Sequence, residues 1–161
     1  MPLQVYIETT VPSYLTARPS RDLIQAARQE LTREWWDQRR AAFDLCTSQL
    51  VLDEVAQGDP DVAERRLALL RGLALLPIED PAIRLAQGFV SEGLLPPRAA
   101  ADALHIAIAT AHELDVLLTW NCRHLANAEI LGGLRVAAQR HDYQLPIICT
   151  PEELMGSVGE E

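Results

Sequence analysis

The chain of 161 residues contains no lysine, so all 14 of its basic residues are arginines. Its 23 acidic residues outnumber them and give a formal net charge of −9. A surface of that sign argues against a protein that coats nucleic acid nonspecifically. It does not exclude an enzyme that holds a divalent cation, because the cation offsets the charge of clustered carboxylates. Arginine also suits two-pronged phosphate contacts better than lysine does.

Cysteines are few, and long apolar runs are missing. Cys46, Cys122 and Cys149 form no CxxC pair, so neither a disulfide framework nor a zinc knuckle is indicated, and we expect reduced thiols. No apolar run approaches the roughly 20 residues that span a bilayer, and MPLQVYIE lacks the features of a signal peptide. We expect a cytoplasmic protein with one domain over residues 1–155 and a flexible tail over 156–161.

Motifs of several enzyme classes are also missing. There is no GxSxG nucleophile elbow, no Walker loop and no GxGxxG, so a small-molecule hydrolase or phosphatase is a weak alternative. The histidines lack the spacing of a zinc site, since His105 and His112 are seven residues apart and His124 follows a later strand.

Short strand-like runs alternate with longer helical segments. The predicted strands are residues 4–7, 43–48, 75–78, 116–119 and 146–149. The predicted helices are 22–40, 49–56, 60–73, one that begins at Asp80-Pro81, 97–114, 128–140, and a last one that Thr150 and Glu153 open with a capping box. Within 22–40, the apolar residues at helical spacing are Leu23, Ala27, Leu31 and Trp35. This alternation indicates an α/β fold with a mostly parallel sheet.

Polar residues stand where several of these elements end or begin. They are Glu8, Thr9 and Thr10 after the first strand, Ser48 and Glu54 after the second, Trp120 and Asn121 after 116–119, and Asp102 near the start of 97–114. Ligands bind parallel sheets at the carboxyl ends of the strands, so these groups could converge on one edge. Clustered carboxylates need a proton or cation among them, and oxygen ligands favour Mg²⁺ or Mn²⁺. Such ions polarise phosphate and activate water, which suggests phosphodiester hydrolysis.

Each of these residues also has an ordinary structural role open to it. Glu8 could be a solvated residue at a strand end, and Glu54 could be a surface charge beside Asp53. Asp102 could compensate a helix dipole, and Asn121 could be a turn residue after a strand. Only the set as a whole indicates a site.

Four segments carry a resemblance to a known family: YIETT with VPSYL, SQLVLDEV, DALHIAIA, and LLTWN with CRHLAN. With them the chain resembles the PIN-domain family, and more narrowly the VapC-like toxins of bacterial toxin–antitoxin pairs. The resemblance covers nearly the whole chain. It implies a three-layer sandwich in which helices flank a central, mostly parallel sheet of about five strands. It also implies a ribonuclease that depends on Mg²⁺ or Mn²⁺ and has four clustered acidic positions.

The resemblance assigns the four catalytic positions to Glu8, Glu54, Asp102 and Asn121. Glu8 and Asp102 would hold a metal ion, Glu54 would bind a second ion or orient or deprotonate the attacking water, and Asn121 would position a water. Thr10 would take the hydroxyl position that supports the first acid or the water. Glu8 stands where Asp is usual and Asn121 where Asp is frequent. A PIN fold that binds RNA or a partner and no longer cuts is therefore the alternative.

Partners follow from the same resemblance. They are an RNA substrate, a cognate antitoxin protein and a second copy of the chain in a homodimer. Arg18, Arg21 and Arg123 lie close in sequence to the proposed edge and could contact the RNA backbone, or they could be ordinary solvated arginines. One ring of Trp35-Trp36 could form a contact surface, although one ring in the core and one at its rim is the simpler interpretation.

Overall fold

A five-stranded sheet forms the centre of the computed structural model, which describes residues 1–156. The strands are β1 (Gln4–Ile7), β2 (Asp44–Ser48), β3 (Ala74–Leu76), β4 (Val116–Leu118) and β5 (Ile147–Cys149), in the order β3-β2-β1-β4-β5. Every neighbouring pair is parallel. The predicted parallel sheet of five strands is therefore confirmed. The flexibility predicted for the tail concerns residues that, apart from Gly156, lie outside the described ones.

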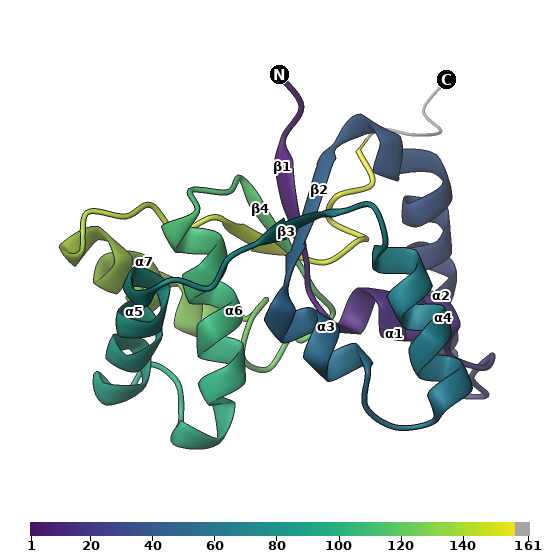
Figure 1. Ribbon diagram of the computed structural model, residues 1–161, viewed down its shortest axis with the longest axis horizontal. Coiled ribbons are helices and arrows are strands. Elements are labelled where there is room, and N and C mark those ends of the chain that lie inside the picture. The colour runs from purple at the N-terminus through teal and green to yellow at the C-terminus, as the bar shows by residue number, and fades with distance from the viewer. Residues whose placement is uncertain (157–161) are drawn as a thin grey trace.

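Helices cover both faces of this sheet (Figure 1). They are α1 (Thr10–Thr16), α2 (Leu23–Glu34), α3 (Gln49–Val55), α4 (Pro60–Leu70), α5 (Asp80–Ser91), α6 (Ala100–Ala111) and α7 (Ala128–Arg140). α1 contacts α2 and α4, and α3 contacts α4, whereas α5 packs against α6 and α7 on the opposite side. The three-layer α/β sandwich is thus confirmed. Within residues 1–156 no helix combines the length and apolarity that a bilayer crossing requires.

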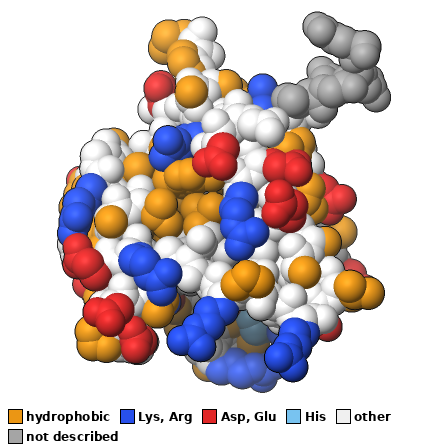
Figure 2. Space-filling model, turned by 90° about the vertical axis from the view of Figure 1, so that its right-hand side faces the viewer, with side chains coloured by type: hydrophobic (Ala, Val, Ile, Leu, Met, Phe, Trp, Pro, Cys, Tyr) orange, Lys and Arg blue, Asp and Glu red, His pale blue; other side chains and the backbone are white. Residues whose placement is uncertain are grey.

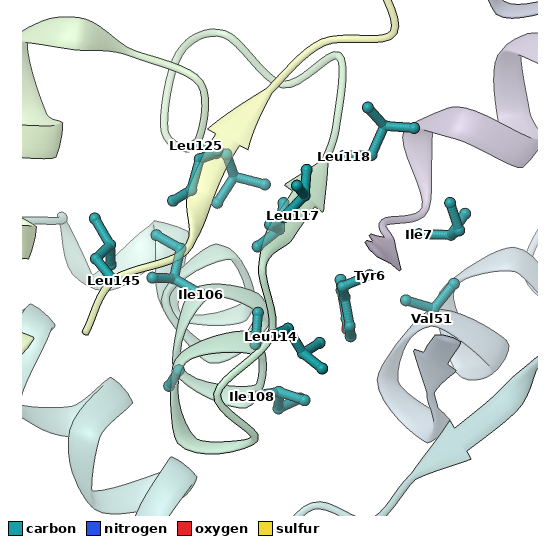
Figure 3. Close-up of a cluster of buried hydrophobic side chains, with 14 of the residues drawn as sticks. Tyr6, Ile7, Val51, Ile106, Ile108, Leu114, Leu117, Leu118, Leu125 and Leu145 are labelled. Carbon is teal, nitrogen blue, oxygen red and sulfur yellow. The ribbon is translucent and has the colours of Figure 1, made fainter. Parts of the chain in front are cut away.

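The core lies between the central strands and the helices on both faces (Figure 3). The whole of β4 is buried, as expected for a strand that parallel neighbours pair with on both sides. Tyr6 of β1 packs edge-on against His105 of α6. The next residue, Ile7, points to the opposite face of the sheet, because side chains alternate along a strand. These contacts fix the direction in which β1 and β4 end, and therefore the place of the residues that follow them.

The predicted helix over 22–40 is broken, and its buried face is not the apolar one. α2 ends at Glu34, after which Trp35–Arg39 forms a π-helical turn and Arg40–Ala42 a 3₁₀ turn. Leu23 is 86% exposed, whereas the buried residues of α2 are Gln29 and Thr32. Both are polar and are buried at low cost because each makes side-chain hydrogen bonds.

Trp35 and Trp36 are both buried, so neither ring offers an exposed contact surface. Trp35 stacks on Phe43, and the guanidinium of Arg40 lies over the ring of Trp36. The sheltered position of both rings follows from the wider π-helical turn, which the sequence pattern does not reveal.

Three further elements differ from the prediction. α1 forms over residues for which the pattern predicts no helix, with Pro12 in its first turn, where its missing N–H breaks no helical bond. At the other end, the Thr150 amide donates to Glu153 Oε1 at 3.1 Å, so the predicted capping box is present. Residues 151–154 nevertheless make only a turn, and the predicted last helix is absent from the described part of the chain. The helix predicted over 97–114 is shorter: a 3₁₀ turn, Pro97–Ala99, precedes α6.

Candidate active site

Glu8 lies at the end of β1, beside the end of β4, and is 3% exposed. Its Oε1 accepts a hydrogen bond from the Thr10 amide at 2.7 Å, and its Oε2 accepts one from the Thr119 hydroxyl at 3.1 Å. Thr119 Oγ1 in turn accepts from the Asn121 amide at 2.9 Å. Neighbouring strands therefore hold the carboxylate in one orientation at the edge where the sequence places it.

Burial raises the pKa of the Glu8 carboxyl above its ordinary value. The nearby His105 and the hydrogen bonds from Thr10 and Thr119 lower this pKa, but they do not outweigh the loss of solvent. The carboxylate is therefore electrostatically unsatisfied when ionised. A proton or a cation at this position would remove the deficit.

Thr10 serves Glu8 through its backbone and ties two elements together through its side chain. Its amide donates to Glu8, while its hydroxyl accepts from the Trp120 amide at 2.8 Å. Trp120 then donates its ring Nε1–H to Thr32 of α2 at 2.7 Å. The start of α1, the end of β4 and the middle of α2 are joined behind the site.

Glu54 extends from α3 toward the same edge. Its Oε1 lies 2.6 Å from the Thr9 hydroxyl, which donates to it, and 2.6 Å from His105 Nε2 on α6. Burial raises the pKa of this carboxyl, but its interaction with His105 and the hydrogen bond from Thr9 bring the net pKa below its ordinary value. Glu54 is therefore a half-buried carboxylate that stays ionised where Glu8 does not readily do so.

Asp102 and Asn121 form the third part of the edge. Asp102, in the first turn of α6, places Oδ2 3.1 Å from His124 Nδ1. Asn121 Oδ1 accepts from the backbone amides of Arg123 at 3.2 Å and His124 at 3.0 Å. This oxygen caps the turn after β4, so the side chain has its amide nitrogen left for other contacts.

Hydrogen bonds and one pair of chain neighbours link the predicted catalytic residues at one edge of the sheet. One path runs from Asp102 through His124, Asn121 and Thr119 to Glu8. The other reaches Glu54 through Thr9, the chain neighbour of Glu8. These residues lie along one edge of the sheet, and that they form one catalytic site stays a prediction.

His105 and His124 belong to the site although the sequence pattern gave them little weight. The spacing of zinc ligands was the wrong test, because each histidine pairs with a carboxylate. The useful signal was the spacing between Asp102 and His105, three residues apart on one helix and therefore on one face. No such local signal exists for His124, which α6 meets only in the folded chain.

The donor chemistry fits Mg²⁺ or Mn²⁺, since the site offers carboxylate oxygens, one of them desolvated. Asp102 Oδ1 and Glu54 Oε2 accept no hydrogen bond from the described residues and retain lone pairs for a ligand. In residues 1–156 no three His, Cys, Asp or Glu side chains are close enough to share an ion. Glu8, Glu54 and Asp102 would have to draw closer around it.

Three exposed arginines lie close in sequence to this edge. Arg18 and Arg21 are exposed in the loop between α1 and α2, and Arg123 is exposed beside Asn121. The buried Gln29 fixes the loop, because its Nε2 donates to the Arg18 carbonyl at 2.9 Å and its Oε1 accepts from the Ser20 amide at 3.0 Å. Figure 2 shows basic side chains gathered along the lower edge of the molecule, toward which β1 runs in Figure 1.

Comparisons with known proteins rest on structure, since neither a family model nor a curated protein matches the chain by sequence. A chain of the VapBC2 complex from Rickettsia felis, solved bound to a DNA fragment from its promoter, is similar with a TM-score of 0.52 and 14% identity. The match covers 92% of this chain and 98% of that one. A chain of FitAB bound to an IR36 DNA fragment has a TM-score of 0.54 and 21% identity, over 91% and 94% of the two chains. The chain has a PIN-domain fold. The edge that carries Glu8, Glu54 and Asp102 is therefore the carboxyl edge of a PIN sheet.

Proposed function

We propose that the protein is a metal-dependent endoribonuclease and the toxin of a toxin–antitoxin pair. The observation that carries the proposal is that Glu8, Glu54 and Asp102, from three separate parts of the chain, lie along the carboxyl edge of a PIN-fold sheet and are held there by hydrogen bonds to Thr119, Thr9 and His124. The structural neighbours come from two-component complexes, which supports an antitoxin partner. An RNA substrate and a homodimer belong to the same proposal.

The residues divide the work as follows. Mg²⁺ or Mn²⁺, when bound, would stabilise charge on the phosphate and activate water for in-line attack. Glu8 and Asp102 would hold the ion, and the ionised Glu54 would hold a second one or accept the proton of the attacking water. Because Asn121 Oδ1 caps a turn, this residue would orient a water or phosphate oxygen through its amide nitrogen.

The test is cleavage of a panel of structured and single-stranded RNAs with Mn²⁺, with Mg²⁺ and with EDTA. Asp102→Asn should lower the metal-dependent rate about 100-fold or more, since it removes one charged ligand and the negative charge beside His124. Asp53→Asn is the matched control: Asp53 is an exposed carboxylate on α3 that bonds only to Gln49 among the described residues. Its rate should stay within about twofold of the wild type.

A second function has its own support. The three carboxylates do not form a preformed metal cluster in the described residues. The side-chain oxygen of Asn121 already accepts hydrogen bonds within a turn. A PIN fold that binds RNA or a partner without cutting would have these features. Well-folded protein that cleaves no RNA in the panel and takes up no Mn²⁺ in titration calorimetry would refute the nuclease and leave this second function.

The arginines predict a salt-dependent RNA affinity. Arg18→Gln, Arg21→Gln and Arg123→Gln should each weaken binding to all single strands alike, and each should reduce the slope of log affinity against log salt by about 0.7. Fluorescence anisotropy with labelled RNA at several salt concentrations measures both effects. Arg135→Gln, on α7 away from this edge, is the control. A slope that the three variants leave unchanged would exclude these arginines from the RNA contact.

A further inference from the structure

A buried row of side chains lies behind Glu54. Ser48 Oγ is 2.8 Å from the Tyr6 hydroxyl, which is 2.8 Å from His105 Nδ1. His105 Nε2 is 2.6 Å from Glu54 Oε1, so the row connects the end of β2 with the site edge through β1 and α6. Ser48, Tyr6 and His105 are 0%, 0% and 2% exposed, and only Glu54 reaches solvent.

The imidazole of His105 is held at both ring nitrogens. On one side the Tyr6 hydroxyl fixes Nδ1, and the Tyr6 ring packs edge-on against the imidazole with centroids 5.8 Å apart. On the other side Nε2 meets the Glu54 carboxylate and no other polar group of residues 1–156. A ring held in this way cannot turn without breaking two buried hydrogen bonds, which makes it a fixed donor.

The direction in which these hydrogen bonds are donated follows from Glu54, the residue at the solvent end of the row. Glu54 Oε1 also accepts the Thr9 hydroxyl, and a carboxylate oxygen can only accept, so the proton between the two residues belongs to His105 Nε2. At the inner end Tyr6 keeps its hydroxyl proton, because burial raises the pKa of the phenol. Tyr6 and Ser48 are thus able to satisfy the far ring nitrogen without ionising.

We propose that His105 is a positioning residue, which donates its Nε2–H to Glu54 and holds that carboxylate at the carboxyl edge of the sheet. A glutamate side chain on the short helix α3 has several rotamers open to it, and the hydrogen bonds from His105 and Thr9 to Oε1 select one of them. The expected effect on catalysis rests on the proposed nuclease function, whereas the hydrogen bond between His105 and Glu54 does not depend on it.

The first measurement concerns the bond. Two-bond ¹H–¹⁵N spectra of the metal-free protein show which nitrogen of each imidazole carries a proton, and His105→Gln identifies the His105 signals by their loss. We expect Nε2 to be protonated and its proton to shift when Glu54 is changed to Ala. A bare Nε2, or an Nε2–H signal indifferent to Glu54→Ala, would overturn the proposal even if the protein were no nuclease.

The second measurement concerns position. In His105→Gln the amide nitrogen can occupy the place of Nε2 and donate to Glu54, whereas the shorter His105→Asn can reach Tyr6 but not Glu54. Mn²⁺ affinity by calorimetry and kcat/KM on the cleaved RNA should fall about 10- to 100-fold in the Asn variant and only about threefold in the Gln variant. Equal losses in the two variants, with equal unfolding midpoints, would make His105 a merely structural residue.

A wild type that neither binds Mn²⁺ nor cuts RNA would refute the proposed function. The imidazole spectra would then still decide whether His105 holds Glu54. The two failures are therefore distinguishable.

Discussion

Replacing Glu8 with glutamine should stabilise the metal-free protein at neutral pH. The carboxylate is 3% exposed, and burial raises its pKa, so the folded state carries a charge that it solvates poorly. Glutamine keeps an oxygen for the Thr10 amide and can donate to Thr119, so the hydrogen bonds survive the change. Each unit of pKa elevation corresponds to about 1.4 kcal/mol, and each kcal/mol moves the melting temperature of a domain of this size by about 2–4 °C.

The pH dependence has a defined sign. Below the ordinary glutamate pKa of 4.5, Glu8 is protonated in both the folded and the unfolded chain and costs nothing. As the pH rises through 4.5 the unfolded chain loses this proton first, so the folded state binds more protons and its stability falls. The advantage of Glu8→Gln should therefore be absent below that pH, grow above it and level off above the raised folded pKa.

Thermal unfolding from pH 4 to pH 8, with EDTA and with Mn²⁺, checks this expectation. Mn²⁺ should raise the melting temperature of the wild type and have a much smaller effect on Glu8→Gln, because the variant lacks one of the two carboxylates proposed to hold the ion. Glu152→Gln, at an exposed turn position, is the control and should melt like the wild type under every condition. A Glu8→Gln protein that is less stable than the wild type at pH 7 would show that the buried charge has full compensation in the metal-free fold.

The sheet and the position of the carboxylates could be predicted because they depend on general features. The apolar run of β4 marks a strand buried by parallel neighbours, and the residues after such strands share one edge of the sheet. Glu8 and Asn121 were located in this way, and Asp102 by its place in the first turn of a helix. Their positions could be predicted without any knowledge of contacts between distant parts of the chain.

The buried polar residues could not be predicted, because their burial depends on contacts between distant parts of the chain. Gln29 and Thr32 are buried because the Arg18 carbonyl and the Trp120 ring lie across from them, and hydrophobic spacing favoured the exposed Leu23 instead. His124 finds Asp102 only when α6 lies beside the turn after β4. A residue that is buried through its hydrogen bonds gives no signal in a hydrophobic pattern.

Trp120 shows how such polar contacts join the site to the helices beside it. Its ring is 6% exposed, packs against Tyr14 at a centroid distance of 5.8 Å and lies 5.2 Å below the guanidinium carbon of Arg28. Its Nε1–H donates to Thr32, and its amide donates to Thr10. One residue thus joins the end of β4 to both α1 and α2.

Trp120→Ala should therefore lower the free energy of unfolding by about 3–5 kcal/mol, because it leaves a large cavity and an unpaired hydroxyl. Trp120→Phe removes only the ring N–H and part of the volume, and we expect it to cost about 1–2 kcal/mol. Denaturant unfolding measures both values. A loss in Trp120→Ala no larger than in Trp120→Phe would show that the ring contributes little beyond its hydrogen bond.

Amide hydrogen exchange distinguishes the loss of a local contact from a general loss of stability. Trp36→Ala removes an equally buried ring in the π-helical turn that follows α2 and should cost a similar free energy. Only Trp120→Ala should speed exchange in residues 17–22, since this loop is held by Gln29 of the helix segment that Trp120 anchors through Thr32. The loop carries Arg18 and Arg21, so loosening it should also weaken RNA binding while Glu8, held by the strand ends, keeps its geometry. Equal exchange in the two alanine variants would place the anchor of this loop in α2 itself.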